Sequence, residues 1–161
     1  MPTHPELDAL ARRVLAANRY VTLATLDPDG RPRLSPVYYV PARHRDLYWV
    51  SSPDAHHSRN LAERPELELV AFDSTVRVGG AEALYASATA RRIADDDLER
   101  VAGEAFDPSR GARAFGPEEL RGDADLRLYA ATMTACEVLV RGGDPVWGRG
   151  VDTRLPAEPW A

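Results

Sequence analysis

Apolar residues near the N-terminus recur with the period of a helix. The positions that share one helical face are Leu7, Leu10, Ala11, Val14 and Leu15. Thr3 and Glu6 have the spacing of a capping box around Pro5, and Asn18 is a residue type that often ends helices. The pattern therefore predicts an amphipathic helix that packs one face on a core.

A hairpin is predicted after this helix. Residues 20–26 are rich in β-branched and aromatic types, and residues 32–40 form a second segment of the same kind. Between them, Asp27-Pro28-Asp29-Gly30 places Pro and Gly where a tight turn favours them. We expect two antiparallel strands joined by this turn.

The next part of the chain alternates strands with a short helix. After a turn at residues 42–46, residues 47–51 predict a strand. Asp54 is placed to cap a helix over residues 55–64, which Pro65 ends. Residues 68–72 alternate apolar and polar positions and predict the following strand.

The C-terminal half begins with a long predicted strand over residues 82–93. A helical stripe then repeats in Leu98, Val101, Ala102, Ala105 and Phe106. Residues 107–125 are rich in Gly, Pro and charge, with one short helix expected at 117–120. A last strand is predicted over residues 127–140, and the residues expected on one side of it are Leu128, Ala130, Thr132, Thr134 and Cys136.

About six strands, mostly joined by hairpins and accompanied by few helices, predict a closed or half-closed antiparallel barrel with flanking helices. This is a mainly β (α+β) architecture. The length of 161 residues suits one domain over residues 1–161, with residues 141–161 as a C-terminal tail for which no element is predicted. No segment approaches the roughly 20 apolar residues of a membrane span, and residues 1–12 lack a signal-peptide pattern, so a cytoplasmic location is expected.

Charge and composition exclude several classes of function. The 25 acidic and 20 basic residues give a net charge of −5, so neither nucleic acid nor an anionic membrane is an expected partner. Every basic residue is arginine, which excludes a Schiff-base lysine and a P-loop lysine. Cys136 is the single cysteine, so no intrachain disulfide is possible.

No self-contained catalytic apparatus is visible in the sequence. The four histidines, His4, His44, His56 and His57, lack the spacing of a metal site, and no metal is expected. Cys136 falls on an apolar strand face, which is typical of a small core residue rather than a nucleophile. Catalytic residues are not identifiable, which points to a bound cofactor or to no catalysis.

A candidate anion site lies where a predicted strand meets a predicted helix. Val50, Ser51 and Ser52 end the strand, and the helix opens with His56, His57, Ser58 and Arg59. A helix N-terminus attracts anions through its free N–H groups and its dipole, and hydroxyl, imidazole and guanidinium groups can complete a phosphate pocket. The alternative is an exposed turn capped by Asp54, whose carboxylate competes with a phosphate for the same donors.

Three segments occur in a recognisable order and spacing. They are Ala24-Thr25-Leu26-Asp27-Pro28-Asp29-Gly30-Arg31-Pro32, then Leu34-Ser35-Pro36-Val37-Tyr38-Tyr39, and, after the strand at 47–52, Ser58-Arg59-Asn60-Leu61-Ala62-Glu63-Arg64-Pro65. Together they resemble the pyridoxamine 5′-phosphate oxidase-like family, whose helix carries a K-x-x-N-L-x-x-x-P pattern. The resemblance covers roughly residues 5–140 and implies a six-stranded antiparallel split β-barrel with flanking helices.

The resemblance also implies a cofactor and a homodimer. In this family two subunits build two equivalent clefts, each holding one flavin mononucleotide (FMN). Ring contacts would come from Ser35, Pro36, Val37 and Tyr38. Contacts to the ribityl chain and phosphate would come from Val50, Ser51, Ser52, His56, His57, Ser58 and Arg59. Trp147 and Arg154 in the tail are similar to a C-terminal Trp and Arg that lie near the cofactor in the oxidases.

The chain departs from the oxidases at charged positions. His56-His57 stands where the oxidases carry an Arg–Lys pair, and Ser35 stands where they carry an Arg. Arg59, or Arg33 on the same strand face as Ser35, is the available replacement. The resemblance therefore implies an FMN-dependent oxidoreductase acting on a small molecule, with vitamin B6 oxidation the least supported version. The alternatives are a reductase that uses the deazaflavin F420 and a non-catalytic flavin- or haem-binding protein.

Overall fold

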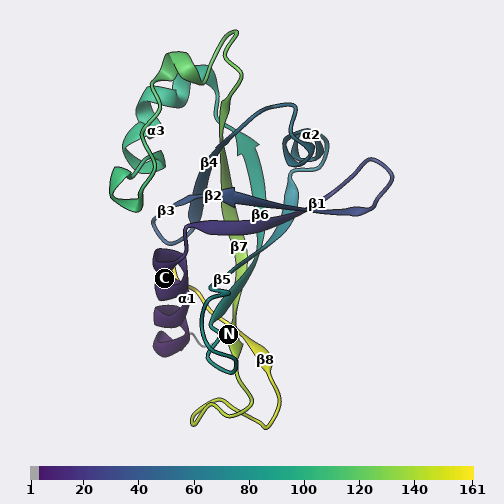
Figure 1. Ribbon diagram of the computed structural model, residues 1–161, viewed down its shortest axis with the longest axis vertical. Helices are drawn as coiled ribbons and strands as arrows, with labels where there is room; N and C mark the ends of the chain where they lie inside the picture. Colours follow the sequence, from purple (N-terminus) through teal and green to yellow (C-terminus); the bar gives the residue numbers. More distant parts are fainter. Residues whose placement is uncertain (1–3) are drawn as a thin grey trace.

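The computed structural model describes residues 4–161. Its first element is helix α1 (Pro5–Ala17), which packs along the lower half of the sheet and contacts β5, β6 and β7 (Figure 1). The buried face of α1 is the predicted one, with Leu7, Ala11, Val14 and Leu15 in the core. The N-cap residue is His4, which makes no side-chain capping bond, and Thr3 of the expected capping box lies outside the described residues. Asn18 ends the helix by donating from its side-chain amide to the Val14 carbonyl at 2.9 Å.

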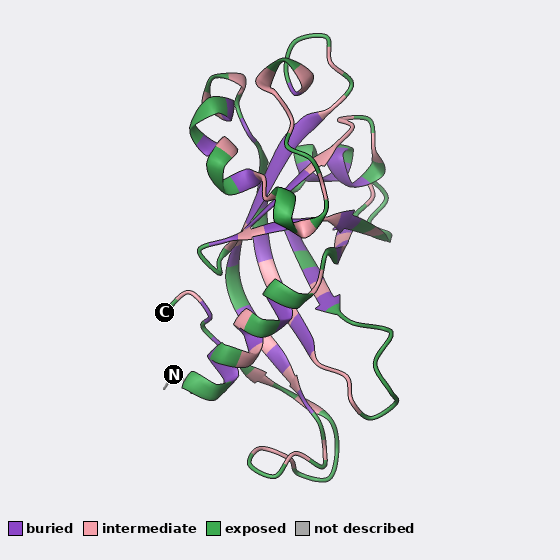
Figure 2. Cartoon of the chain, turned by 60° about the vertical axis from the view of Figure 1, so that its left-hand side comes forward, coloured by how far each residue is buried: buried purple, intermediate pink, exposed green. Residues whose placement is uncertain are grey.

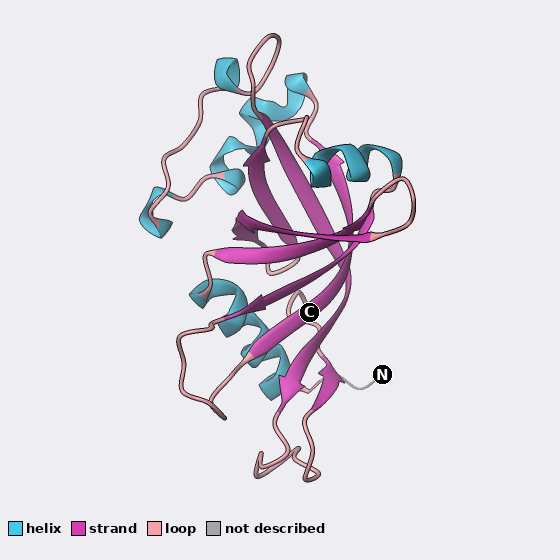
Figure 3. Cartoon of the chain, turned by 45° about the vertical axis from the view of Figure 1, so that its right-hand side comes forward, coloured by secondary structure: helices cyan, strands magenta, loops and turns pink. Residues whose placement is uncertain are grey.

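Eight strands form one antiparallel sheet within residues 4–161. They are β1 (Tyr20–Leu26), β2 (Pro32–Tyr38), β3 (Val40–Ala42), β4 (Asp46–Ser51), β5 (Glu66–Phe72), β6 (Ala83–Arg92), β7 (Arg127–Val140) and β8 (Thr153–Pro156). The order across the sheet is β2-β1-β5-β6-β7-β4-β3, and β8 pairs with β7. The sheet curls into a half-barrel, which confirms the mainly β split-barrel architecture; the two strands beyond six are the short β3 and β8 (Figure 3).

The predicted strand over residues 32–40 divides into β2 and β3. The two parts belong to opposite edges of the sheet, because β2 pairs with β1 whereas β3 pairs with β4. Tyr39 lies at the break and is fully buried. Its hydroxyl donates to the Leu15 carbonyl at 2.8 Å and its backbone N–H donates to the Arg19 carbonyl at 3.0 Å. These contacts hold the chain where it crosses from one edge to the other.

The expectation that five residues share one side of β7 is wrong. The register between β6 and β7 shifts at Ser87 and Ala88, so β7 carries a bulge at Thr134. Before the bulge, Leu128 and Ala130 pack toward α3 (Leu98–Ala105), whereas Cys136 after it packs in the barrel core. Burial raises the pKa of the Cys136 thiol to about 12, so this cysteine is a core residue and an inert thiol.

Two apolar clusters result from this arrangement, and Figure 2 shows the buried stripes that they form along the strands. The larger fills the barrel and includes α1, and the smaller lies between α3 and the outer face of β3, β4 and β7. Helix α2 (His56–Glu63) adds Leu61 to the barrel core. Short 3₁₀ turns at Asp95–Asp97, Pro108–Arg110 and Pro117–Glu119 flank and follow α3. Within residues 4–161, no helix has the length and apolar character needed to cross a membrane.

Candidate functional site

A cavity of about 440 Å³ lies at the split of the barrel, where β2 and β4 approach each other and the segment after α3 closes over them. Its lining comes from five parts of the chain. Those residues are Arg19, Tyr20, Tyr38, Val40, Tyr48, Trp49, Val50, Ala105, Phe106, Arg110, Gly111, Ala112, Arg113, Phe115 and Leu126. Two of the residues expected at a flavin, Tyr38 and Val50, therefore meet in one cavity.

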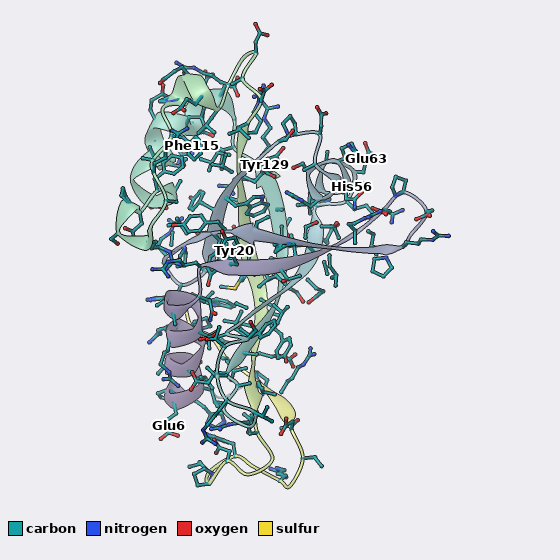
Figure 4. The ribbon with its side chains drawn as sticks, viewed as in Figure 1. Glu6, Tyr20, His56, Glu63, Phe115 and Tyr129 are labelled. Carbon is teal, nitrogen blue, oxygen red and sulfur yellow. The ribbon has the colours of Figure 1, made fainter. Side chains whose placement is uncertain are left out.

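Aromatic side chains make up much of the cavity wall. Tyr20 and Tyr38 meet edge to face with ring centroids 6.1 Å apart. Behind this wall, in the barrel core, Trp49 stacks on Tyr129 with ring centroids 5.7 Å apart. Phe115 lies on the far side, in the segment that follows α3, and Figure 4 shows it across from Tyr20. Flat apolar walls of this kind suit a planar ring system, because aromatic groups gain from stacked and edge-to-face contacts.

Two side-chain polar atoms of the residues that line the cavity lack partners within residues 4–161. They are the Tyr38 hydroxyl and the indole N–H of Trp49, both buried. A buried polar group without a hydrogen bond is costly, so native proteins rarely leave one unless a ligand or water completes it. The cavity therefore has largely apolar walls, and two buried polar atoms without partners belong to the residues around it.

The start of α2 lies just beyond the end of β4. Ser51 Oγ is 2.8 Å from Nε2 of His57, and the His57 side chain is buried. Ser58 is also buried, and its hydroxyl has no partner within the described chain. The predicted cap is wrong: the N-cap residue is Ala55, and no side chain caps this helix. The Asp54 carboxylate thus makes no capping bond with the N–H groups of the first turn.

Burial lowers the pKa of His57, and the neighbouring His56 lowers it further. The fold therefore favours the neutral imidazole, and the unfolded chain binds more protons as the pH falls. We expect the free energy of unfolding to be unaffected by His57 above its ordinary pKa and to decrease as the pH drops from about 7 to about 5. Measured by urea unfolding across this pH range, the free energy of unfolding should decrease less in His57→Gln than in the wild-type protein.

His56→Gln is the comparison variant: His56 is exposed on the same turn of α2 and is the smaller cause of the lowered pKa of His57, so this variant should keep most of the pH dependence. Carboxylates such as Asp27, whose pKa is lowered to about 2, titrate below this window. A pH profile that is identical in wild-type protein and His57→Gln would contradict the assignment of the effect to His57.

The two arginines that the sequence offers as phosphate partners both have partners of their own. The Arg59 guanidinium donates to the Asp54 carbonyl. Arg33 forms an ion pair with Asp27 at 2.7 Å, and this contact is the largest cause of the lowered pKa of Asp27. Arg33 and Arg59 line a second, open hollow of about 920 Å³ between α2 and the β1–β2 turn.

This second hollow fits an anion less well than the Ser51–His57 side of the helix. Its wall includes the carboxylates of Asp27, Asp29 and Glu63, and Figure 4 shows Glu63 with His56 on α2. Its main structural feature is Asn60, whose buried amide donates to Thr25 Oγ1 at 3.0 Å and to Asp27 Oδ1 at 2.9 Å. These two bonds fix α2 on the β1–β2 hairpin.

The remaining predicted site residues are more scattered. Ser35 lies half-buried on β2 opposite Leu23, and Pro36 is exposed on the same strand. Trp147 packs against His4 with ring centroids 4.6 Å apart, and the Arg154 guanidinium lies 3.6 Å from the Tyr85 ring centroid. Arg154 is on β8, at the opposite end of the molecule from α2 (Figure 1), so a single chain does not bring it to the α2 site.

Sequence reasoning missed several residues of this region. Phe106, Phe115 and Arg110 follow α3, far along the chain from β2 and β4, and no local pattern placed them at the cavity. Arg127, the first residue of β7, is buried and pairs directly with Ser51 in the sheet. The one available signal was composition, since aromatic and arginine residues interleave over residues 106–115.

Comparisons with known proteins give one family match. The sequence model of the family described as pyridoxamine 5′-phosphate oxidase matches residues 7–138. No curated protein matches the sequence.

Solved structures share the fold. A haem-binding protein from Mycobacterium smegmatis is 20% identical, with a TM-score of 0.70 over 99% of this chain and 61% of its own. This chain thus spans about three-fifths of that protein's length. HutZ, the haem storage protein from Vibrio cholerae, is 19% identical, with a TM-score of 0.59 over 93% of this chain and 99% of its own. A protein from Clostridium acetobutylicum related to general stress protein 26, of the pyridoxine phosphate oxidase family, is 10% identical, with a TM-score of 0.66 over 95% and 96%.

Proposed function

This chain belongs to the pyridoxamine 5′-phosphate oxidase family, and we propose that it binds FMN at the split of the barrel and acts as a flavin-dependent oxidoreductase on a small molecule. The observation that carries the proposal is the aromatic cavity at the split of the barrel, whose walls include Tyr20, Tyr38, Phe106 and Phe115. It adjoins the end of β4, where the start of α2 offers hydroxyl and imidazole groups.

Different parts of the chain would hold the ring and the phosphate of FMN. The ring would lie in the cavity beside β2, where Ser35, Pro36, Val37 and Tyr38 follow one another. Val50, Ser51 and Ser52 would face the ribityl chain. The phosphate would lie at the start of α2, near His56, His57, Ser58 and Arg59. A bound flavin supplies hydride and electron transfer, and the protein's part is to bind it, orient it and exclude water.

Haem is the second candidate, favoured by the folds shared with haem-binding and haem storage proteins. A haem site in the cavity would need an axial ligand. Among residues 4–161, no His, Cys or Met lines the cavity, so in this part of the chain tyrosines are its only side chains of a ligating type. The Nε2 atom of His57 is already at hydrogen-bond distance from Ser51. The donor set therefore favours a flavin, or the related deazaflavin F420, over haem.

The purified protein tests this proposal through the ligand that it retains. We expect the visible absorption bands of an oxidised flavin and, after denaturation, a released compound with the mass of FMN. Bleaching of these bands by a nicotinamide donor or another small reductant would support the oxidoreductase. Retained haem or F420 would overturn the FMN assignment, and a bound flavin that accepts no electrons would leave a non-catalytic binder.

Dimerisation is part of the proposal, because the family cleft is built from two subunits. The outer face of β1 and β2 exposes apolar side chains, with Leu34 67% exposed and Tyr20 62% exposed. Exposed apolar residues that cluster on a sheet face typically mark an interface. Trp147 and Arg154, which are remote from the α2 site of their own chain, would then act at the partner's cleft.

Leu34→Asp should weaken the dimer, because a carboxylate would be buried at an apolar contact. We expect the dissociation constant of the dimer to rise roughly 10- to 100-fold, measured by sedimentation equilibrium. Val78→Asp is the control, since Val78 is fully exposed in the loop between β5 and β6. A wild-type monomer that binds flavin normally would contradict the composite cleft.

A further inference from the structure

Arg127 is a buried arginine beside the phosphate end of the proposed site. It is only 8% exposed, although arginine is among the residue types least often buried. In the pairing of β4 with β7 it lies directly opposite Ser51. Directly opposed residues of antiparallel strands project from the same face of a sheet, so Arg127 shares its face with Ser51 and the start of α2.

The Arg127 guanidinium has no anionic partner within residues 4–161. It donates to the backbone carbonyls of Gly122 at 2.5 Å and Leu126 at 2.7 Å, and to that of Ala124. Its Nε is buried and has no hydrogen-bond partner in the same part of the chain. The neutral carbonyls satisfy part of its donor capacity but leave its charge without a counter-ion.

A buried charge is costly unless a charge of opposite sign accompanies it. Nearby, Ser51 contacts His57, and the uncapped first turn of α2 presents N–H donors. Arg33 is already paired with Asp27, and Arg59 is an exposed arginine that donates to the Asp54 carbonyl, so Arg127 is the buried arginine on this side. An incoming anion would therefore meet hydroxyl, imidazole and backbone donors, and one buried cation.

We propose that Arg127 is the cationic partner of the phosphate monoester held at the start of α2. This inference deepens the proposed function and rests on it. Arg127 would supply from β7 the positive charge that Ser35 and His57 do not supply from β2 and α2. A phosphate monoester is close to a dianion at neutral pH, so a buried guanidinium is a suitable partner.

The test compares FMN with riboflavin, which has the same ring and lacks the phosphate. In Arg127→Met, we expect the affinity for FMN to fall roughly 10- to 100-fold while the affinity for riboflavin stays within a factor of about two. Inorganic phosphate should raise the melting temperature of the wild-type protein and should no longer do so in the variant. Arg91→Met, an exposed arginine on β6, is the matched control and should change neither reading.

Arg127→Gln guards against loss of folding, since its amide can still donate to a carbonyl of the 122–126 loop while the charge is gone. It should lose the preference for FMN over riboflavin as Arg127→Met does. If both variants lose affinity for FMN and for riboflavin equally, Arg127 only stabilises the 122–126 loop, which would overturn the inference. Unchanged affinities for both ligands would overturn it as well.

The proposed function and the role of Arg127 can fail separately. A wild-type protein that binds no flavin would overturn the proposed function, yet its response to inorganic phosphate would still test Arg127. A wild-type protein that binds FMN, with variants that keep the preference for it, would overturn the role of Arg127 alone.

Discussion

Replacing Ala112 with tryptophan is expected to weaken FMN binding roughly 100-fold or more, the largest effect on affinity that we foresee. Ala112 lies after the turn at Pro108–Arg110 and lines the cavity at the split of the barrel. An indole there would occupy space in a cavity of about 440 Å³ that the isoalloxazine ring needs. For FMN to bind, either the indole or the isoalloxazine ring would have to leave the cavity and lose several kcal/mol of packing energy. Each 1.4 kcal/mol corresponds to a tenfold change in affinity.

Fluorescence titration with FMN and with riboflavin measures this effect, and both ligands should be affected because the ring is displaced. Ala112 is only half-buried, so the variant should keep its fold. Ala114→Trp is the control: this residue is exposed on the same loop and does not line the cavity. If Ala112→Trp binds FMN as tightly as the wild-type protein, the ring does not lie in this cavity.

Replacing Asn60 with alanine is expected to lower the free energy of unfolding by about 1–3 kcal/mol. The buried Asn60 amide donates to Thr25 Oγ1 and to Asp27 Oδ1. Thr25 is only 2% exposed, so its hydroxyl would be left without its partner inside the protein. Because α2 carries His57 and is fixed on the hairpin by these bonds, the affinity for FMN should decrease together with stability.

Urea unfolding measures the first effect, and Asn18→Ala is the matched control. The Asn18 amide donates once, to the Val14 carbonyl at the half-exposed end of α1, so its loss should cost less. Equal losses for the two variants would show that the hydrogen bonds of Asn60 have no special role in fixing α2.

The hairpin, the order of the elements and the junction of β4 with α2 were predictable because each rests on local signals. Each of these signals involves only a few neighbouring residues. They are the turn residues at 27–30, the alternation of apolar and polar positions along the strands, and Pro65. The expected proximity of Ser51 to the start of α2 also follows from a short connection, and the structure places Ser51 Oγ 2.8 Å from the His57 ring.

Other features depend on tertiary contacts that no local pattern reports. The second strand breaks at Tyr39, whose hydroxyl donates to a carbonyl of α1. The bulge at Thr134 exchanges the two faces of β7, which a strict period of two cannot anticipate. The partnership of Arg127 with Ser51 requires the register of β4 on β7, and the two residues are far apart in the sequence.

The absence of lysine changes how the site has to be charged. Where the resemblance to the oxidases implies an arginine and a lysine at the start of α2, this chain has His56 and His57. His57 is buried and its pKa is lowered. The cationic contribution would therefore come from a buried arginine on β7 rather than from the helix itself. On this proposal the positive charge beside the anion would come from β7 instead of α2.

The most direct test of the central claim is titration of the ligand-free protein with FMN, followed through the absorption bands of the flavin and with F420 and haemin as competitors. We expect saturation at one FMN per chain, displacement by neither competitor at equal concentration, and loss of binding in Ala112→Trp. Saturation by haemin or F420 with no response to FMN would contradict it.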